Sequence, residues 1–117
     1  ASNKILNLCL DKKLKLLLSP QILEEVKKVL FRKKFDFIDS NKKNEFLFLL
    51  TEIAEIISPR IKIDVCKDKT DNKFVELAVE GKADYIVSGD QHLLTLREFM
   101  GIKIVNSKEF LETIHQR

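Results

Sequence analysis

The sequence predicts an α/β protein built on a mainly parallel central sheet. Short apolar runs alternate along the chain with helical patterns, and this alternation is typical of parallel strands joined by crossover helices. The runs are bounded by Gly, Ser and Pro, residues that end strands and begin turns. With 117 residues, 44% of them hydrophobic, the chain is long enough for one core. We find no internal repeat and no linker, and we therefore treat residues 1–117 as a single domain.

The first half of the chain predicts three helices and one strand. The pair Ser19-Pro20 ends the strand and begins a helix, with Pro at the first helical position, and Ser58-Pro59 stops the long third helix. The elements are helix Lys4–Leu10, capped by Ser2 or Asn3, strand Leu14–Leu18, helix Gln21–Lys33, and a helix from Asp39 or Ser40 to about Ile57. Within that last helix five apolar residues are consecutive from Phe46 to Leu50, more than one buried stripe needs, so part of it is expected to face a partner.

The second half begins with the alternating segment Ile61–Val65, which predicts an extended stretch with one buried face. Gly81 follows a helix at the position where a left-handed C-terminal cap is expected. The remaining elements are helix Asn72–Glu80, strand Ala83–Val87 covered on both faces, a helical pattern over Gln91–Phe99, strand Gly101–Val105, and a last helix capped by Asn106 or Ser107.

Composition narrows the classes of protein. The net charge of +3 is a weak pointer to an acidic partner. Cys9 and Cys66 are too few for a disulfide framework and lack zinc-binding spacing, so both are expected to be small core or surface residues of a protein in a reducing cytosol. No run of 18 apolar residues occurs, and no leader peptide is evident. We expect a soluble, cytoplasmic protein that does not enter a membrane.

Three acids are candidate ligands for a cation. Asp90 follows a predicted strand, and Asp71 begins the helix that feeds that strand. Ligands of open α/β sheets bind beyond the carboxyl ends of the strands. Glu25 lies at the edge of the apolar stripe of its helix, from which it can reach into a cleft. Each acid also has a structural alternative: Asp71 as a helix N-cap, Asp90 as a strand-end turn residue and Glu25 as a solvated carboxylate.

Three segments in this order resemble the PIN-domain ribonucleases, in particular the toxin components of toxin–antitoxin pairs. The segments are SPQILEEVKKVL, KDKTDNKFVELAVEGKADYIVSGDQHLL and GIKIVNSKEFL, which span Ser19 to Leu111. The resemblance implies a Rossmann-like sheet with acids at the carboxyl end of its strands that bind Mg²⁺ or Mn²⁺. The acids of the family match Glu25, Asp71 and Asp90, and these are the predicted catalytic and metal-binding residues.

Two further residues lie beside this predicted site. Ser88 occupies the Ser/Thr position two residues before the last acid of the family. Asp68 is either an acid outside the direct ligands or a turn residue, and the turn is favoured.

The chain departs from the family at its beginning. PIN domains begin with a buried strand that ends in Asp-Thr-Asn, and nothing in Ala1–Leu10 matches it. A sheet without this middle strand leaves two neighbours with unpaired backbone groups. We therefore expect upstream residues to carry the strand and a fourth acidic ligand; the alternative is a strand donated by another chain.

Basic residues gather at the end of the Glu25 helix beside Phe31 and Phe35. They are Lys27, Lys28, Arg32, Lys33 and Lys34. Lys and Arg interleaved with aromatics suit single-stranded RNA, whereas the structural alternative is that the lysines favour the helix dipole and the phenylalanines fill the core.

The sequence thus predicts a metal-dependent endoribonuclease, the toxin of a toxin–antitoxin pair, with RNA as substrate and an antitoxin and a homodimer implied by the family alone. The alternatives are a non-catalytic interaction module with a degenerate acid site and a housekeeping PIN nuclease that processes RNA.

Overall fold

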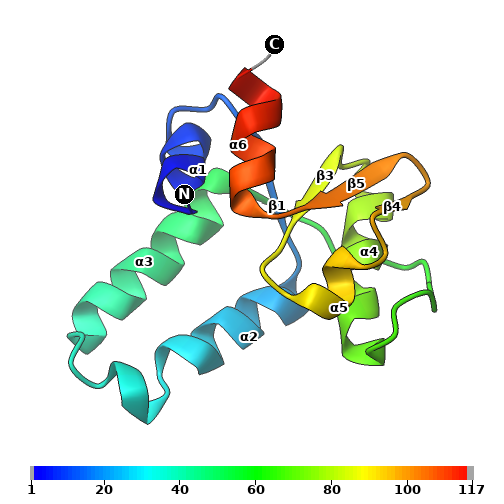
Figure 1. The fold of residues 1–117 in the computed structure, drawn as a ribbon. Coiled ribbons are helices and arrows are strands. Elements are labelled where there is room, and N and C mark those ends of the chain that lie inside the picture. The colour runs from blue at the N-terminus through cyan, green and yellow to red at the C-terminus, as the bar shows by residue number, and fades with distance from the viewer. Residues whose placement is uncertain (1, 116–117) are drawn as a thin grey trace.

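The computed structural model describes residues 2–115, and it confirms the α/β class (Figure 1). The strands are β1 (Leu16–Leu18), β2 (Ala54–Ile56), β3 (Tyr85–Val87), β4 (Glu98–Phe99) and β5 (Ile102–Val105). The helices are α1 (Ser2–Leu10), α2 (Pro20–Leu30), α3 (Ser40–Ile53), α4 (Asn72–Glu80), α5 (Gln91–Leu94) and α6 (Ser107–His115), with 3₁₀ turns η1 (Lys33–Phe35) and η2 (Lys69–Asp71). Within residues 2–115 no helix is long and apolar enough to cross a membrane.

The strands form two separate sheets. One is the parallel pair β1–β2; the other has the order β3–β5–β4, with β3 parallel and β4 antiparallel to β5. One buried cluster joins β1 to α2, α3 and α4, and a second joins α4 to α5 and β5. Helix α4 contributes to both clusters, and its Val75 is fully buried, so α4 holds the two sheets together.

An apolar groove of about 410 Å³ separates β1 from β3. Leu18 accepts a hydrogen bond from Ile57 beyond β2, so in this parallel ladder the backbone groups of Leu17 point away from β2. By the same alternation Tyr85 and Val87 direct their backbone groups away from β5, because Ser88 donates to Val105. The free edges of β1 and β3 line the groove, and a strand between these two edges stays a prediction.

Helix α4 has the predicted bounds, but its C-terminal cap differs from the prediction. Gly81 has a right-handed conformation (φ −86°), and Lys82 takes the left-handed position (φ 57°). Lys82 N–H donates to Val79 and Ala83 N–H donates to Ala78, which is the hydrogen-bond pattern of a Schellman cap. Gly81 serves packing instead, since a Cβ there would lie 2.6 Å from Leu17 Cδ1.

The last helix begins with a reciprocal cap. The Asn106 side chain accepts from the Glu109 N–H (2.8 Å), and Glu109 Oε1 accepts from the Asn106 N–H (3.1 Å). This confirms Asn106 as the cap. Phe110 and Leu111 are buried as expected, and Cys9 and Cys66 are buried free thiols.

The predicted helix from Ser40 to Ile57 is wrong in its last turn. Helix α3 ends at Ile53, and residues 54–56 pair with β1 in the register Leu16↔Ala54. The apolar periodicity does not distinguish a helical turn from a buried strand, and pairing with the β1 backbone decides the conformation. Phe48 stays 65% exposed, as the run of consecutive apolar residues implied.

Two predictions for the second sheet also need correction. Strand β3 is shorter than Ala83–Val87 and is not covered on both faces, because Val87 is 37% exposed. The helical pattern over Gln91–Phe99 stops at Leu94, and Glu98–Phe99 turns back onto β5 as a hairpin. The two residues between these strands, Met100 and Gly101, have φ values of 52° and 83°, as tight hairpin turns require.

The segment predicted as an extended strand, Ile61–Val65, runs alongside α4 without joining a sheet. Its expected buried face is only partly present, because Ile63 packs against the second buried cluster whereas Ile61 and Val65 are exposed. Side chains one turn apart on α4 hold its backbone: Glu80 accepts from residues 60 and 61, Glu76 from residue 63, and Asn72 from residues 65 and 66. The helix thus replaces a neighbouring strand for this segment.

Candidate metal site at the end of β3

Two of the three predicted acids meet at the carboxyl end of β3. Asp90 follows β3 by three residues and precedes α5, and Asp71 closes η2 immediately before α4. The carboxylate of Asp90 lies close enough to raise the pKa of Asp71. We call these two residues the acid pair. Its place corresponds to the general location of ligand sites in α/β sheets.

Asp71 is the buried member of the acid pair. Its residue is only 7% exposed, and its Oδ2 atom is buried without a hydrogen-bond partner in the described chain. Burial, followed by the charges of Asp90 and Asp68, raises the pKa of its carboxyl above the ordinary value. Asp71 stands at the N-cap position of α4, yet its side chain makes no capping hydrogen bond. The structural alternative for Asp71 therefore does not account for its position.

Asp90 is held by local hydrogen bonds. Its Oδ1 accepts from the His92 N–H (2.9 Å), so it caps the four-residue helix α5, and the His92 ring Nδ1 is 3.5 Å away. The Ser88 hydroxyl accepts from the Asp90 N–H (3.0 Å). Ser88 thus fixes the turn that presents Asp90. Asp90 is thus a capping and turn residue, and its role as a cation ligand stays a prediction.

Asp68 is a turn residue, as favoured from the sequence. Its Oδ1 accepts from both the backbone N–H (2.9 Å) and the hydroxyl (2.7 Å) of Thr70, and these bonds lower the pKa of Asp68. Its charge still contributes to the raised pKa of Asp71. Asp68 therefore shapes η2 and adds negative potential to the acid pair.

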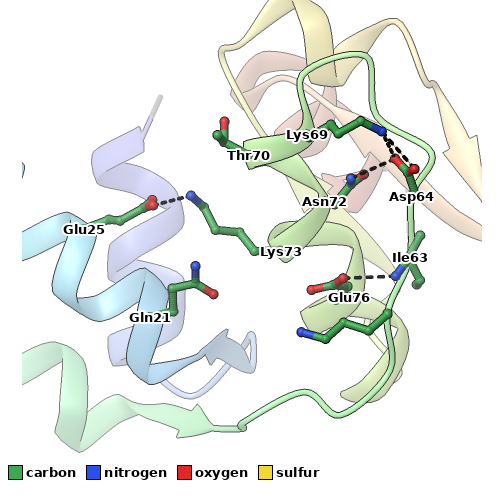
Figure 2. Close-up of a pocket in the computed structure, with 10 residues that line it drawn as sticks. Gln21, Glu25, Ile63, Asp64, Lys69, Thr70, Asn72, Lys73 and Glu76 are labelled. Atoms are coloured by element: carbon green, nitrogen blue, oxygen red, sulfur yellow. Dashed lines mark hydrogen bonds and ion pairs between the residues drawn. The ribbon is translucent and has the colours of Figure 1, made fainter.

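Glu25 does not join the acid pair. Its carboxylate forms an ion pair with Lys73, the second residue of α4, across a polar cleft of about 530 Å³ (Figure 2). The side chain of Lys73 is mostly buried, with its ammonium 5.5 Å from the Phe74 ring centroid. The predicted position of Glu25 at the edge of a cleft is thus observed, but its partner is a lysine.

The wall of the polar cleft opposite Glu25 also carries an ion pair. Lys69 Nζ contacts both oxygens of Asp64 (2.7 and 2.8 Å), and Asn72 Nδ2 donates to the same carboxylate (3.3 Å) (Figure 2). These contacts, the lysine hydrogen bond first, lower the pKa of Asp64. The cleft therefore presents paired charges of both signs next to the acid pair.

The donors present fit a hard cation in part. Mg²⁺ takes oxygen ligands and typically only one or two carboxylates, with waters and substrate oxygens for the rest. The unpartnered Oδ2 of Asp71 and the neighbouring carboxylate of Asp90 supply such oxygens and gain from a positive charge between them. No group of three His, Cys, Asp or Glu side chains in residues 2–115 is arranged to hold a metal ion.

The basic residues predicted to contact RNA lie away from the acid pair. Lys27 and Lys28 are on the last turn of α2, and Arg32, Lys33 and Lys34 are at and within η1. All five are exposed. The structure places them on the connection between α2 and α3, at the end of the molecule away from the β3–β5–β4 sheet in the view of Figure 1.

Sequence reasoning missed Lys73 and the anchoring residues of α4. Asn72, Glu76 and Glu80 recur every four residues on the polar side of an amphipathic helix, which is a signal that the sequence does contain. No such signal exists for Lys73, because its partner Glu25 is 48 residues away.

An α/β fold with carboxylates beyond the end of a parallel strand has the general arrangement of ligand-binding α/β proteins. A PIN-domain profile matches residues 1–92, most of the chain. The chain belongs to the PIN-domain family, whose members are in general nucleases that act on RNA. It is similar to the uncharacterized protein MJ1680 of Methanocaldococcus jannaschii, with 34% identity over 119 residues, 93% of this chain and 76% of that protein. No solved structure matches the chain.

Proposed function

We propose that this PIN domain is a metal-dependent endoribonuclease that cleaves RNA phosphodiesters, with Mg²⁺ or Mn²⁺ held by Asp71 and Asp90. The observation that carries the proposal is the buried, unpartnered Oδ2 of Asp71 beside a second carboxylate. Two neighbouring carboxylates repel each other when both are ionised, and a cation between them relieves this repulsion without a shared proton. Burying a charged group without a partner is costly, so its retention favours a ligand.

The side chains of the site divide the work. Asp71 and Asp90 hold and orient the cation, and Ser88 keeps Asp90 in place through the hydrogen bond to its backbone N–H. A bound divalent cation supplies a more acidic water and neutralises charge on the phosphate oxygens. Once Glu25 leaves Lys73, its carboxylate serves as a further ligand of the cation or accepts a hydrogen bond from the attacking water. The ammonium of Lys73 then faces a phosphate of the substrate.

The same proposal includes the biological role of a toxin in a toxin–antitoxin pair. An antitoxin protein is its inferred partner, and a homodimer its inferred assembly; both follow from the resemblance to PIN-domain toxins. The exposed Phe48 on α3 is a contact available to such a partner.

The test is cleavage of a fluorescently labelled single-stranded RNA in Mn²⁺ or Mg²⁺, with and without EDTA. We expect cleavage that EDTA abolishes and that Asp90→Asn reduces by at least about a hundredfold. The matched control is Asp84→Asn, which removes an exposed carboxylate just before the other end of β3. Cleavage that persists in EDTA, or that both variants reduce equally, would contradict the proposal.

A non-catalytic interaction module is the second candidate, and the absence of a three-ligand cluster within residues 2–115 favours it. It predicts no cleavage in any metal, yet the cation still stabilises the fold through Asp71. A housekeeping PIN nuclease shares the chemistry proposed above and differs in its RNA. Cleavage of structured transfer or ribosomal RNA in preference to single strands would favour that role.

A further inference from the structure

The connection between α2 and α3 concentrates the positive charge of the whole molecule. Residues 27–43 contain seven Lys or Arg and two Asp, a net charge of +5. Because the whole chain carries +3, all remaining residues together carry −2. We call residues 27–43 the basic corner. The molecule is thus a slightly acidic body with one strongly basic end, and such an asymmetry attracts polyanions.

Apart from the buried Lys43, the charges of the basic corner lie at the surface. None of its Lys or Arg side chains forms an ion pair with a carboxylate in the part of the chain that the structure describes. Asp39, one of its two acids, is occupied as the cap of α3, where its Oδ1 accepts from the Asn41 N–H (3.0 Å). The positive charge is therefore available to a ligand.

Aromatic rings stand among these charges. Phe37 is 81% exposed, more than any other large apolar residue of the described chain, and its ring centroid is 6.4 Å from that of Phe35. Lys34 Nζ lies 5.1 Å from the Phe35 ring centroid. Exposing a Phe to this extent gains nothing for folding, because burial of apolar surface is what stabilises the fold. A ring held in water beside cations is a stacking platform for bases.

The basic corner has a rigid base. Lys43 of α3 is only 3% exposed, and its ammonium lies 5.0 Å from the Phe31 ring centroid at the end of α2. This contact connects the two helices behind the corner. The backbone that carries the basic corner is thus tied to both helices.

Helix α2 leads from the acid pair to the basic corner. Glu25 reaches Lys73 beside the acid pair, and Arg32 follows seven residues later. At about 1.5 Å per residue the two positions are roughly 10 Å apart along the helix direction, a span of a few nucleotides. An RNA strand that crosses the polar cleft at Glu25 can therefore extend over the corner.

We propose that the basic corner is a binding platform for single-stranded RNA, in which Phe37 stacks on a base and Arg32, Lys33 and Lys34 contact phosphates outside the cleavage site. This rests on the proposed function in taking RNA as the substrate. Charge complementarity commits the surface to a polyanion, and the bare ring selects single strands, whose bases are free to stack.

The experiment measures binding without cleavage. A fluorescein-labelled RNA of about ten nucleotides is titrated with the full chain in EDTA, and the dissociation constant is read from fluorescence anisotropy at several salt concentrations. We expect Phe37→Ala to weaken binding roughly tenfold, because stacking on an aromatic ring is worth that order. We expect Arg32→Gln with Lys33→Gln to lower the salt dependence by the release of one or two counterions.

Phe48→Ala is the matched control, since it removes another exposed phenylalanine, one that lies between Glu45 and Glu52 on α3. It should leave the RNA affinity unchanged. Phe37→Ala is expected to fold normally, and circular dichroism checks this. Equal affinities of Phe37→Ala and wild type would overturn the proposal, as would a Phe37→Ala effect limited to the oligomeric state in sedimentation, which marks a protein interface.

Failure of the platform and failure of the nuclease remain distinguishable. RNA that binds through Phe37 in EDTA but is cut in no metal contradicts only the nuclease. If Phe37→Ala cleaves RNA with an unchanged KM, this result contradicts only the platform proposal.

Discussion

Replacing Asp71 with Asn tests the proposed cation site through stability alone. The substitution keeps the shape of the side chain and removes a charge that is 7% exposed, carries an unpartnered oxygen and lies beside Asp90. A buried polar group without a partner costs about 1–3 kcal/mol, more when charged. Because an amide retains part of this cost, we expect Asp71→Asn to raise the free energy of unfolding in EDTA by about 1 kcal/mol at pH 7.

The dependence on pH has a definite sign. The pKa of Asp71 is raised in the folded protein, so between its ordinary value and the folded value the folded state binds more protons than the unfolded state. The stabilisation is present on the acid side and is lost as the pH rises through the folded pKa. Asp71→Asn should abolish this part of the pH dependence. The pKa values of Asp64 and Asp68 are lowered in the folded protein. The contribution of these two carboxylates to the stability of the fold is therefore lost only as the pH falls below their ordinary pKa range.

The assay is thermal unfolding followed by circular dichroism. For a domain of this size 1 kcal/mol corresponds to about 4 °C in Tm. Wild type in Mg²⁺ or Mn²⁺ at ten times the dissociation constant should gain about 1.4 kcal/mol, or roughly 6 °C, and Asp71→Asn should gain none. Asp84→Asn serves as a control that keeps the gain. The reasoning is refuted if Asp71→Asn lowers Tm in EDTA while wild type is indifferent to both cations.

Three further substitutions test the scaffold of the site. Gly81→Ala should cost about 1 kcal/mol in urea denaturation, because the ends of the Leu17 and Ile57 side chains must shift to admit its Cβ. Gly89→Ala, with no atom within 4 Å of the added Cβ, should stay within about 0.5 kcal/mol of wild type, and equal midpoints would contradict the packing. Asn72→Ala should cost about 2 kcal/mol and speed hydrogen exchange at the two amides that its Oδ1 accepts from, and unchanged exchange would show that the anchor is dispensable. Gln substitutions of Lys73 and Glu25, combined in a double-mutant cycle, should give a coupling of about 0.5–1 kcal/mol, and additivity of the two would mean that the pair does not persist in solution.

Local chemistry accounts for the elements that were predicted correctly. The bounds of α4 follow from its apolar spacing, and the start of α6 follows from a capping residue and a Glu three positions later. Ser19 caps α2 by accepting from the Ile22 N–H (3.1 Å), and Pro20 occupies the first helical position. All these interactions join residues within four positions of each other along the chain, so both partners can be recognised in one short stretch of sequence.

The errors occurred where pairing or packing with another element decides the conformation. Residues 54–56 leave the helical pattern because β1, almost forty residues earlier, offers a paired edge. Residues 98–99 do so because β5 folds back on them through a hairpin turn. Gly81 was assigned a conformational role, but the observed feature is its close packing against Leu17 on another element. The periodicity of apolar residues along the sequence carries no information on contacts of this kind.

For the candidate site, the sequence by itself determined which residues are acidic, that Asp90 follows a strand and that Asp71 begins a helix. These features, with the resemblance they support, identified the PIN-domain family. Only the tertiary structure decided that Asp71 is buried with a bare oxygen beside Asp90, and that Glu25 pairs with Lys73. Burial and pairing depend on how α2, η2, α4 and the end of β3 pack together, and no local stretch of sequence contains that packing.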